Sequence, residues 1–149
     1  MLIFIDTEFN GFGGELISLA LVTNTGKDFY EVLQPTKPIV HWVRENVMPY
    51  LEQEPITIEK FQVKLYQYLM DVSEYCREPL TIIADWPDDI KYFCESLITG
   101  PGTSIPTPVK MNFVLDRSLS SELSQVPHNA YHDAVAIMKD YYGKNNEVV

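Results

Sequence analysis

Two carboxylates stand two residues apart at the end of the first apolar run of the chain. Asp6 and Glu8 follow Leu2–Ile5, which is typical of a buried strand. Because side chains two residues apart on a strand point the same way, we expect both carboxylates on one side. Like charges held close together resist joint ionisation unless a cation neutralises them. Mg²⁺ and Mn²⁺ prefer such oxygen ligands, so the pattern predicts a metal site. The alternative is a solvated turn, because D-x-E also occurs by chance.

A third acidic candidate, Asp89, lies at the start of a predicted helix. This helix follows a second apolar run, Leu80–Ala84, and carries aromatic residues three and four positions after Asp89. We expect these aromatics to anchor the helix and to direct Asp89 toward the sheet. The helix dipole alone also favours acids in a first turn, which would explain Asp88 and Asp89 without any chemistry. Asp85, at the end of the apolar run, is a rival for the same role.

The last candidates are a histidine and an aspartate near the C-terminal end of the chain. His128 precedes the closing predicted helix, and Asp133 lies in its first turns. A histidine beside a metal-bound carboxylate suits general-base chemistry, because its pKa lies near neutrality. The alternative is an exposed loop histidine and an ordinary helix acid. His132 is expected at the surface or behind the site, and His41 is expected to be structural.

The order of apolar runs predicts the elements that must position these residues. We predict strands at Leu2–Ile5, Glu15–Thr23, Phe29–Gln34, Leu80–Ala84 and Val109–Leu115. We predict helices at Val40–Leu51, from Ile58 to near Glu78, at Asp89–Ile98 and at Asn129–Tyr142, the last ended by Gly143 before a frayed tail, and a loop at Thr99–Pro108. Three antiparallel strands followed by alternating helices and strands indicate an α/β fold. The expected architecture is a mixed sheet flanked by helices, of the ribonuclease H-like class.

Composition limits the classes of function. The 149 residues predict a single domain, 1–149, and no apolar run approaches the roughly 20 residues that span a bilayer. The absence of a signal segment, together with only two cysteines, Cys76 and Cys94, predicts a cytoplasmic protein with reduced thiols. Eleven basic residues against 21 acidic ones give a net charge of −10, without the basic patch usual in nucleic-acid-binding proteins. Either metal ions supply the affinity for phosphate, or phosphate is not the ligand.

Together the candidate residues resemble the DEDD family of 3′-5′ exonucleases, which have the ribonuclease H-like fold. The first family motif resembles Asp6-Thr7-Glu8, and the second resembles Asp89 with its two aromatic neighbours. The third motif, H-x-x-x-x-D, is similar to His128 through Asp133. The tyrosine subgroup would need Tyr at position 129, where this chain has Asn129. The resemblance is therefore to the histidine subgroup, DEDDh, and covers nearly the whole chain.

Within this subgroup the chain resembles the small bacterial and phage 3′-5′ exoribonucleases of the type that trims poly(A). The segments that carry this resemblance are Asp6-Thr7-Glu8-Phe9, Glu15-Leu16-Ile17-Ser18 and Trp42-Val43-Arg44 running to Val47-Met48-Pro49. The chain departs from other members at the second motif, where H-N-A usually precedes the aspartate. Here Ala84-Asp85-Trp86 stands in that place, so Asp85, Asp88 and Asp89 remain in competition.

The resemblance implies a two-metal nuclease. It implies that Asp6, Glu8, Asp89 and Asp133 hold two Mg²⁺ or Mn²⁺ ions about 3.5–4 Å apart, and that His128 takes the proton from the attacking water. The implied substrate is single-stranded RNA or DNA with a free 3′ end, with RNA favoured through the resemblance alone. The implied products are nucleoside 5′-monophosphates.

Thr7, Phe9 and Leu16, near the first motif, are expected to contact the substrate. The backbone around Thr7, Glu8 and Phe9 could receive the terminal nucleotide, and Phe9, Phe12 or Leu16 could stack or wedge against bases. Ordinary packing is the alternative for each of them. Trp42 and Trp86 would suggest stacking if they are exposed and only packing if they are buried.

Two other classes of function compete with the exonuclease. An acidic protein that mimics nucleic acid would explain the charge of −10, but not the placement of the motif residues. A ribonuclease H-like endonuclease would use the same metals, but the position of His128 argues against it. We also expect a possible homodimer, for which the predicted helix carrying Tyr66, Tyr68 and Tyr75 could supply a face.

Overall fold

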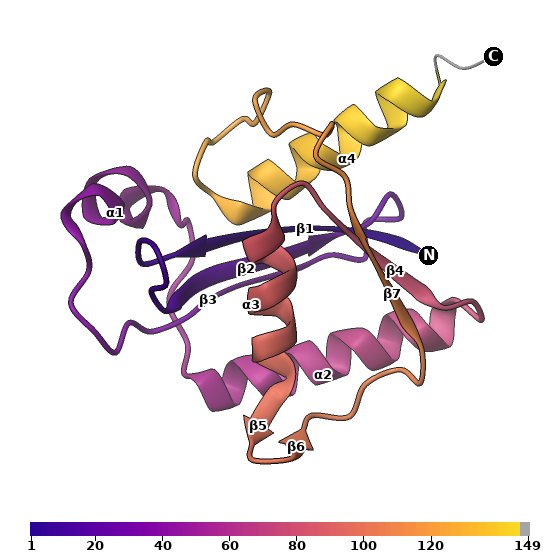
Figure 1. The fold of residues 1–149 in the computed structure, drawn as a ribbon, viewed down its shortest axis with the longest axis horizontal. Coiled ribbons are helices and arrows are strands. Elements are labelled where there is room, and N and C mark those ends of the chain that lie inside the picture. Colours follow the sequence, from indigo (N-terminus) through magenta and orange to yellow (C-terminus); the bar gives the residue numbers. More distant parts are fainter. Residues whose placement is uncertain (147–149) are drawn as a thin grey trace.

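The computed structural model describes residues 1–146, and its centre is a five-stranded mixed sheet (Figure 1). The strands lie in the order β3-β2-β1-β4-β7, with bounds β1 Leu2–Phe9, β2 Leu16–Val22, β3 Phe29–Val32, β4 Leu80–Ala84 and β7 Met111–Leu115. The first three strands pair antiparallel, and β4 and β7 add to β1 in parallel. The predicted fold class, an α/β mixed sheet flanked by helices, is confirmed, and the strand order resembles ribonuclease H-like topology.

Helices cover both faces of this sheet. Their bounds are α1 His41–Asn46, α2 Ile58–Tyr75, α3 Pro87–Leu97 and α4 Ala130–Asn146, with a 3₁₀ turn η1 Met48–Tyr50 after α1. In Figure 1, α4 crosses one side of the sheet, whereas α2 and α3 lie on the other, and α1 stands beyond the end of β1. None of the helices within residues 1–146 has the length and apolar character needed to cross a membrane.

The alternation of β1 divides the core between the two faces. Ile3 and Ile5 pack with α2 side chains such as Phe61 and Leu65. Phe4 points the other way and packs with Ile137 of α4. Because a strand has a period of two, Asp6 and Glu8 continue the row of Phe4 and face the side of α4. Burial of each large apolar side chain contributes about 1.5–3 kcal/mol, so this register is strongly specified.

Strand boundaries differ from the prediction mainly at β1 and β3. The first strand was predicted to end at Ile5, but β1 continues to Phe9, because β2 pairs with it as far as Phe9 opposite Leu16. Asp6 and Glu8 therefore lie inside the strand. β3 ends at Val32, two residues earlier than predicted, and β7 begins at Met111 rather than Val109. Part of the predicted loop 99–108 forms a small hairpin of β5 Ile98–Gly100 and β6 Thr103–Ser104.

Helix ends differ as well. The predicted helix 40–51 is divided into α1 and η1, with Pro49 inside the second turn. α2 ends at Tyr75, where Cys76 becomes extended, and α3 begins at Pro87, a residue that suits the first helical position. Gly143 was predicted to end the last helix, but α4 continues through it to Asn146, so residues 144–146 are not a frayed tail.

The predicted tyrosine face of α2 is only partly exposed. Tyr66 and Tyr75 are exposed, but Tyr68 is buried, packs against Phe29 and donates its hydroxyl hydrogen to the Lys27 carbonyl. Tyr68 therefore belongs to the core and cannot contribute to a docking face.

Candidate metal centre

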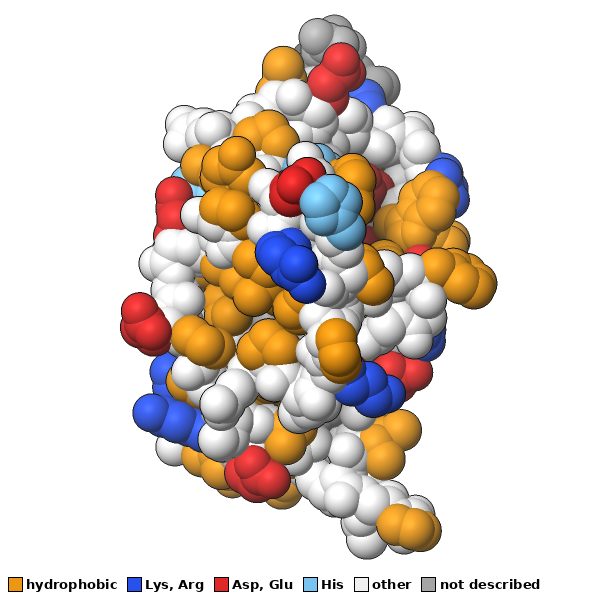
Figure 2. Space-filling model, turned by 90° about the vertical axis from the view of Figure 1, so that its left-hand side faces the viewer, with side chains coloured by type: hydrophobic (Ala, Val, Ile, Leu, Met, Phe, Trp, Pro, Cys, Tyr) orange, Lys and Arg blue, Asp and Glu red, His pale blue; other side chains and the backbone are white. Residues whose placement is uncertain are grey.

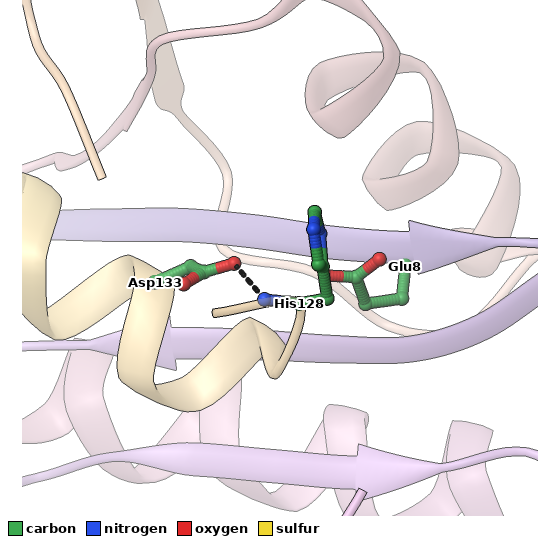
Figure 3. Close-up of side chains that lie close together, drawn as sticks. All are labelled: Glu8, His128 and Asp133. Carbon is green, nitrogen blue, oxygen red and sulfur yellow. Dashed lines mark hydrogen bonds between the residues drawn. The ribbon is translucent and has the colours of Figure 1, made fainter. Parts of the chain in front are cut away.

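One cluster brings together Glu8, His128 and Asp133. Each offers one ligand atom, and these atoms lie within 4.8 Å of one another. Figure 3 shows that they come from different parts of the chain: Glu8 from β1, His128 from the loop before α4, and Asp133 from α4 itself. The His128 backbone N–H donates to Asp133 Oδ2 at 3.1 Å, while the imidazole ring lies beside Glu8.

A second cluster contains Asp6, Asp85 and Asp89, again with ligand atoms within 4.8 Å of one another. Asp89 is 2% exposed, and its Oδ1 accepts a hydrogen bond of 2.6 Å from Thr7 Oγ1. Asp85 and Asp89 both belong to this cluster, so Asp85 does not take the place of Asp89. The chain turns between the end of β4 and the first turn of α3, which brings the two residues together. Asp88 is directed elsewhere, since its Oδ2 accepts the indole N–H of Trp86.

Asp6 joins the two clusters. The negative charges of Asp89, Glu8 and Asp133 all raise its pKa, after the larger effect of burial. Burial first, and then neighbouring carboxylates, raise the pKa of Glu8 to about 8. Burial also raises the pKa of Asp89 to about 7. Asp6, Glu8 and Asp89 therefore keep their protons to a higher pH than isolated carboxyl groups, whose pKa values lie near 4.

The donors of this group fit a divalent cation. Asp89 Oδ2 and Asp133 Oδ1 are buried oxygens without a hydrogen-bond partner among the described residues. Within residues 1–146, no Lys or Arg forms a salt bridge with Asp6, Glu8, Asp89 or Asp133. Buried carboxylates normally have partners, and hard cations are bound by such oxygen atoms. These acidic clusters could therefore hold metal ions.

Asn129 fixes the start of α4 and thereby the position of Asp133. It is fully buried, and its Oδ1 accepts the backbone N–H groups of Tyr131 and His132, as a helix N-cap does. Its Nδ2 donates to the Tyr50 carbonyl at 2.7 Å, which ties α4 to η1. The sequence comparison with the tyrosine subgroup singled out this position but did not reveal its capping role.

His128 has an unusual backbone and an aromatic neighbour. Its φ is +64°, a left-handed conformation that is uncommon for a residue other than glycine. The edge of its exposed ring lies against Trp42 of α1, with 5.1 Å between ring centroids. Trp42 is itself 54% exposed. His132, by contrast, is half-buried and bonded to Glu52, and His41 is exposed beside Glu45.

The three expected substrate contacts have different surroundings. Thr7 points to the face of β1 opposite Asp6, and its hydroxyl donates a hydrogen bond to Asp89. The Phe9 ring stacks on Tyr92 at 4.9 Å, and Leu16 lines a groove of about 640 Å³ between the ends of β2 and β3 and the helices α2 and α3. Figure 2 shows hydrophobic side chains gathered across the middle of this side of the molecule. The groove also carries Glu59 and Glu95, and these charges disfavour a phosphate there.

Several contributors were difficult to recognise in the sequence. Asp85 was considered a rival of Asp89, whereas the two lie in one cluster. Trp42 contacts His128 across a separation of 86 residues, and no local pattern indicates that contact. Arg117 lies over the ring of Trp86, and only the register of β4 and β7 brings these residues together.

The sequence matches no family model, and no curated protein sequence matches it significantly. The function must therefore be inferred from the fold and the site.

Proposed function

We propose that this protein is a DEDDh-type 3′-5′ exonuclease that removes nucleoside 5′-monophosphates from the end of single-stranded nucleic acid, RNA in preference to DNA. One observation carries this proposal: Asp6, Glu8, Asp89 and Asp133 converge around the end of β1 with His128 beside them. The strand order, which resembles ribonuclease H-like topology, supports it. The preference for RNA rests only on the sequence resemblance.

The buried acids and the exposed histidine have different tasks in this proposal. Two Mg²⁺ or Mn²⁺ ions would activate the attacking water and stabilise the charge that develops on the phosphate. Asp6 belongs to the second cluster, and the charges of Glu8 and Asp133 in the first cluster also act on it, so it would contribute to both sites. Glu8 and Asp133 would hold one ion, and Asp89, supported by Asp85, would complete the other.

His128 has the properties of a general base. Its ring is exposed and forms no hydrogen bond to any of the described residues, so its nitrogen atoms can accept a proton. Its backbone is held by Asp133, and Trp42 limits one side of the ring. A histidine side chain with a free ring nitrogen is a common general base in proton transfer.

The overall acidity favours a single-stranded end over a duplex. With a charge of −10, the chain lacks the long-range attraction that holds proteins on double-stranded DNA. A flexible single strand can reach the acidic centre once cations occupy it. An acidic mimic of nucleic acid would instead require its carboxylates at the surface, whereas Asp89 and Asp133 are buried.

The direct test is degradation of matched RNA and DNA strands labelled at the 5′ end, with Mg²⁺ or Mn²⁺ and with EDTA. We expect a ladder that shortens from the 3′ end, release of 5′-monophosphates and faster cleavage of RNA. His128→Ala should lose at least about 100-fold in rate, as expected for removal of a general base. His41→Ala is the matched control, because His41 is exposed on α1, where its ring pairs with Glu45, and it belongs to neither acidic cluster.

Other outcomes would contradict this function. Cleavage of a circular strand would indicate an endonuclease, because an exonuclease needs an end. No cleavage of either strand with either metal would remove the enzyme proposal and favour the acidic mimic.

A further inference from the structure

Beside the acidic clusters, Trp86 and Arg117 form an exposed stacked pair. The guanidinium carbon of Arg117 lies 4.1 Å from the centre of the Trp86 ring. Trp86 is 49% exposed, and Arg117 is exposed as well. Trp86 directly follows Asp85, a member of the second cluster, so the pair adjoins the candidate metal centre.

The sheet explains why these two residues meet. β4 and β7 are parallel neighbours whose last residues, Ala84 and Leu115, are paired. The segments that follow them leave the sheet side by side, and the Asp116 N–H donates to the Ala84 carbonyl at 2.9 Å. Ligands of open α/β sheets are commonly bound at such carboxyl ends of neighbouring parallel strands.

Arg117 forms no ion pair within the described structure, although its positive charge lowers the pKa of Asp85 against the larger, opposite effect of burial. No carboxylate of residues 1–146 lies within salt-bridge distance of its guanidinium. Two nearby acids are bonded to other donors: Asp116 to the Ser118 N–H and hydroxyl, and Asp88 to the Trp86 indole. Asp85, the acid that senses the charge of Arg117, belongs to the second acidic cluster. The aromatic ring therefore holds the guanidinium beside an acidic centre without an ion pair. A planar guanidinium in this state suits bidentate binding of phosphate.

We propose that Trp86 and Arg117 form a subsite for the nucleotide next to the scissile phosphate, with the base against the indole and the neighbouring phosphate on the guanidinium. This inference rests on the proposed function. It explains how a chain of charge −10 holds a single strand without a basic patch: one arginine beside an aromatic platform supplements the metal centre. Stacking on an indole tolerates any base, so the subsite selects single strands rather than a sequence.

The kinetic test compares two substrates. One is a single-stranded ten-nucleotide RNA, and the other is the 4-nitrophenyl ester of a nucleoside 5′-monophosphate, which has no neighbouring nucleotide. For Trp86→Ala and Arg117→Ala, we expect KM for the RNA to rise about tenfold or more beyond any change for the ester. Trp86→Phe should retain most of the RNA affinity, and Arg117→Lys should not restore it fully.

Arg77→Ala is the matched control, because it removes one exposed positive charge before β4, at the opposite end of that strand. It should leave the ratio of the two KM values unchanged. Equal losses on both substrates would indicate a merely structural pair, and no loss on either would also overturn the subsite. A loss with Arg77→Ala as large as with Arg117→Ala would show that only net charge matters.

A fluorescence measurement separates this inference from the proposed function. The chain has two tryptophans, so Trp42→Phe leaves Trp86 as the sole indole emitter. In a Trp42→Phe/His128→Ala variant with Mg²⁺, a labelled RNA strand should bind and quench Trp86, and Arg117→Ala should weaken that binding. Quenching in a protein that proves to have no nuclease activity would remove the proposed function and keep the subsite. An RNA that fails to bind, or binds without quenching, would overturn the subsite.

Discussion

At the scale of single residues, the acidic clusters that could hold metal ions contain carboxylates whose burial is unfavourable without a cation. Asp89 has one oxygen bonded to Thr7 and one buried oxygen without a partner. Burial raises its folded-state pKa to about 7, above the value of about 4 in an unfolded chain. The stability linked to Asp89 is therefore fully present below pH 4 and is lost as the pH rises through 7.

Because the ionised Asp89 carboxylate destabilises the metal-free fold, Asp89→Asn should have a pH-dependent effect on stability. At pH 8 the substitution should raise the free energy of unfolding by about 1 kcal/mol or more, because it removes a buried charge, whereas at pH 5, inside the window between the two pKa values, the gain should be smaller. For a chain of this size the expected change in melting temperature is about 2–4 °C per kcal/mol. Thermal unfolding in EDTA at both pH values measures it. A loss of stability at pH 8 would show that the ionised carboxylate is already well solvated.

At the scale of elements, caps and strand register bring the site residues together. Asn129 caps α4 and also reaches the Tyr50 carbonyl, so it positions both Asp133 and the segment that carries Trp42. A buried polar side chain with such bonds affects stability more than an exposed cap does.

We predict that Asn129→Ala lowers the free energy of unfolding by about 2–4 kcal/mol, the sum of a lost cap and an unpaired buried carbonyl. Asn129→Ser is the matched variant: its neutral hydroxyl can keep the cap but has no amide to donate to Tyr50, and it should lose less. Chemical denaturation of the three proteins compares them. Equal stability of Asn129→Ala and the parent would contradict the role of the cap.

Gly143 is a position in the same helix where a substitution should increase stability. α4 continues through it, and a Cβ at this position would meet no atom within 4 Å. Gly143→Ala should therefore stabilise the protein by up to about 1 kcal/mol, since alanine has the higher helix propensity. A drop in melting temperature would show that α4 ends at Gly143, as the sequence alone suggested.

At the scale of the whole molecule, the sequence predicted the sheet and singled out acids that lie in the two clusters, but not the surroundings of these acids. Short apolar runs such as Leu2–Ile5 and Leu80–Ala84 indicate buried strands, so the fold class could be predicted from the sequence. The extension of β1 to Phe9 could not, because it depends on pairing with Leu16 across a turn. The contact of Trp42 with His128 depends equally on the assembled fold.

Part of the net negative charge of the chain belongs to the acidic clusters. Asp6, Glu8, Asp85, Asp89 and Asp133 account for five acidic groups gathered in one place. Two divalent ions would cancel four of these charges. Much of the local repulsion is therefore specific to the metal-free protein.

A Mn²⁺ titration followed by electron paramagnetic resonance shows whether these carboxylates form a divalent-metal centre. The signal of free Mn²⁺ should show two ions bound per parent chain and fewer for Asp6→Asn, because Asp6 belongs to one cluster and the charges of the other act on it. Asp71→Asn, an exposed acid on α2, should bind as the parent does. If the parent binds no Mn²⁺, or if Asp6→Asn binds as many ions as the parent, the carboxylates are not a metal centre.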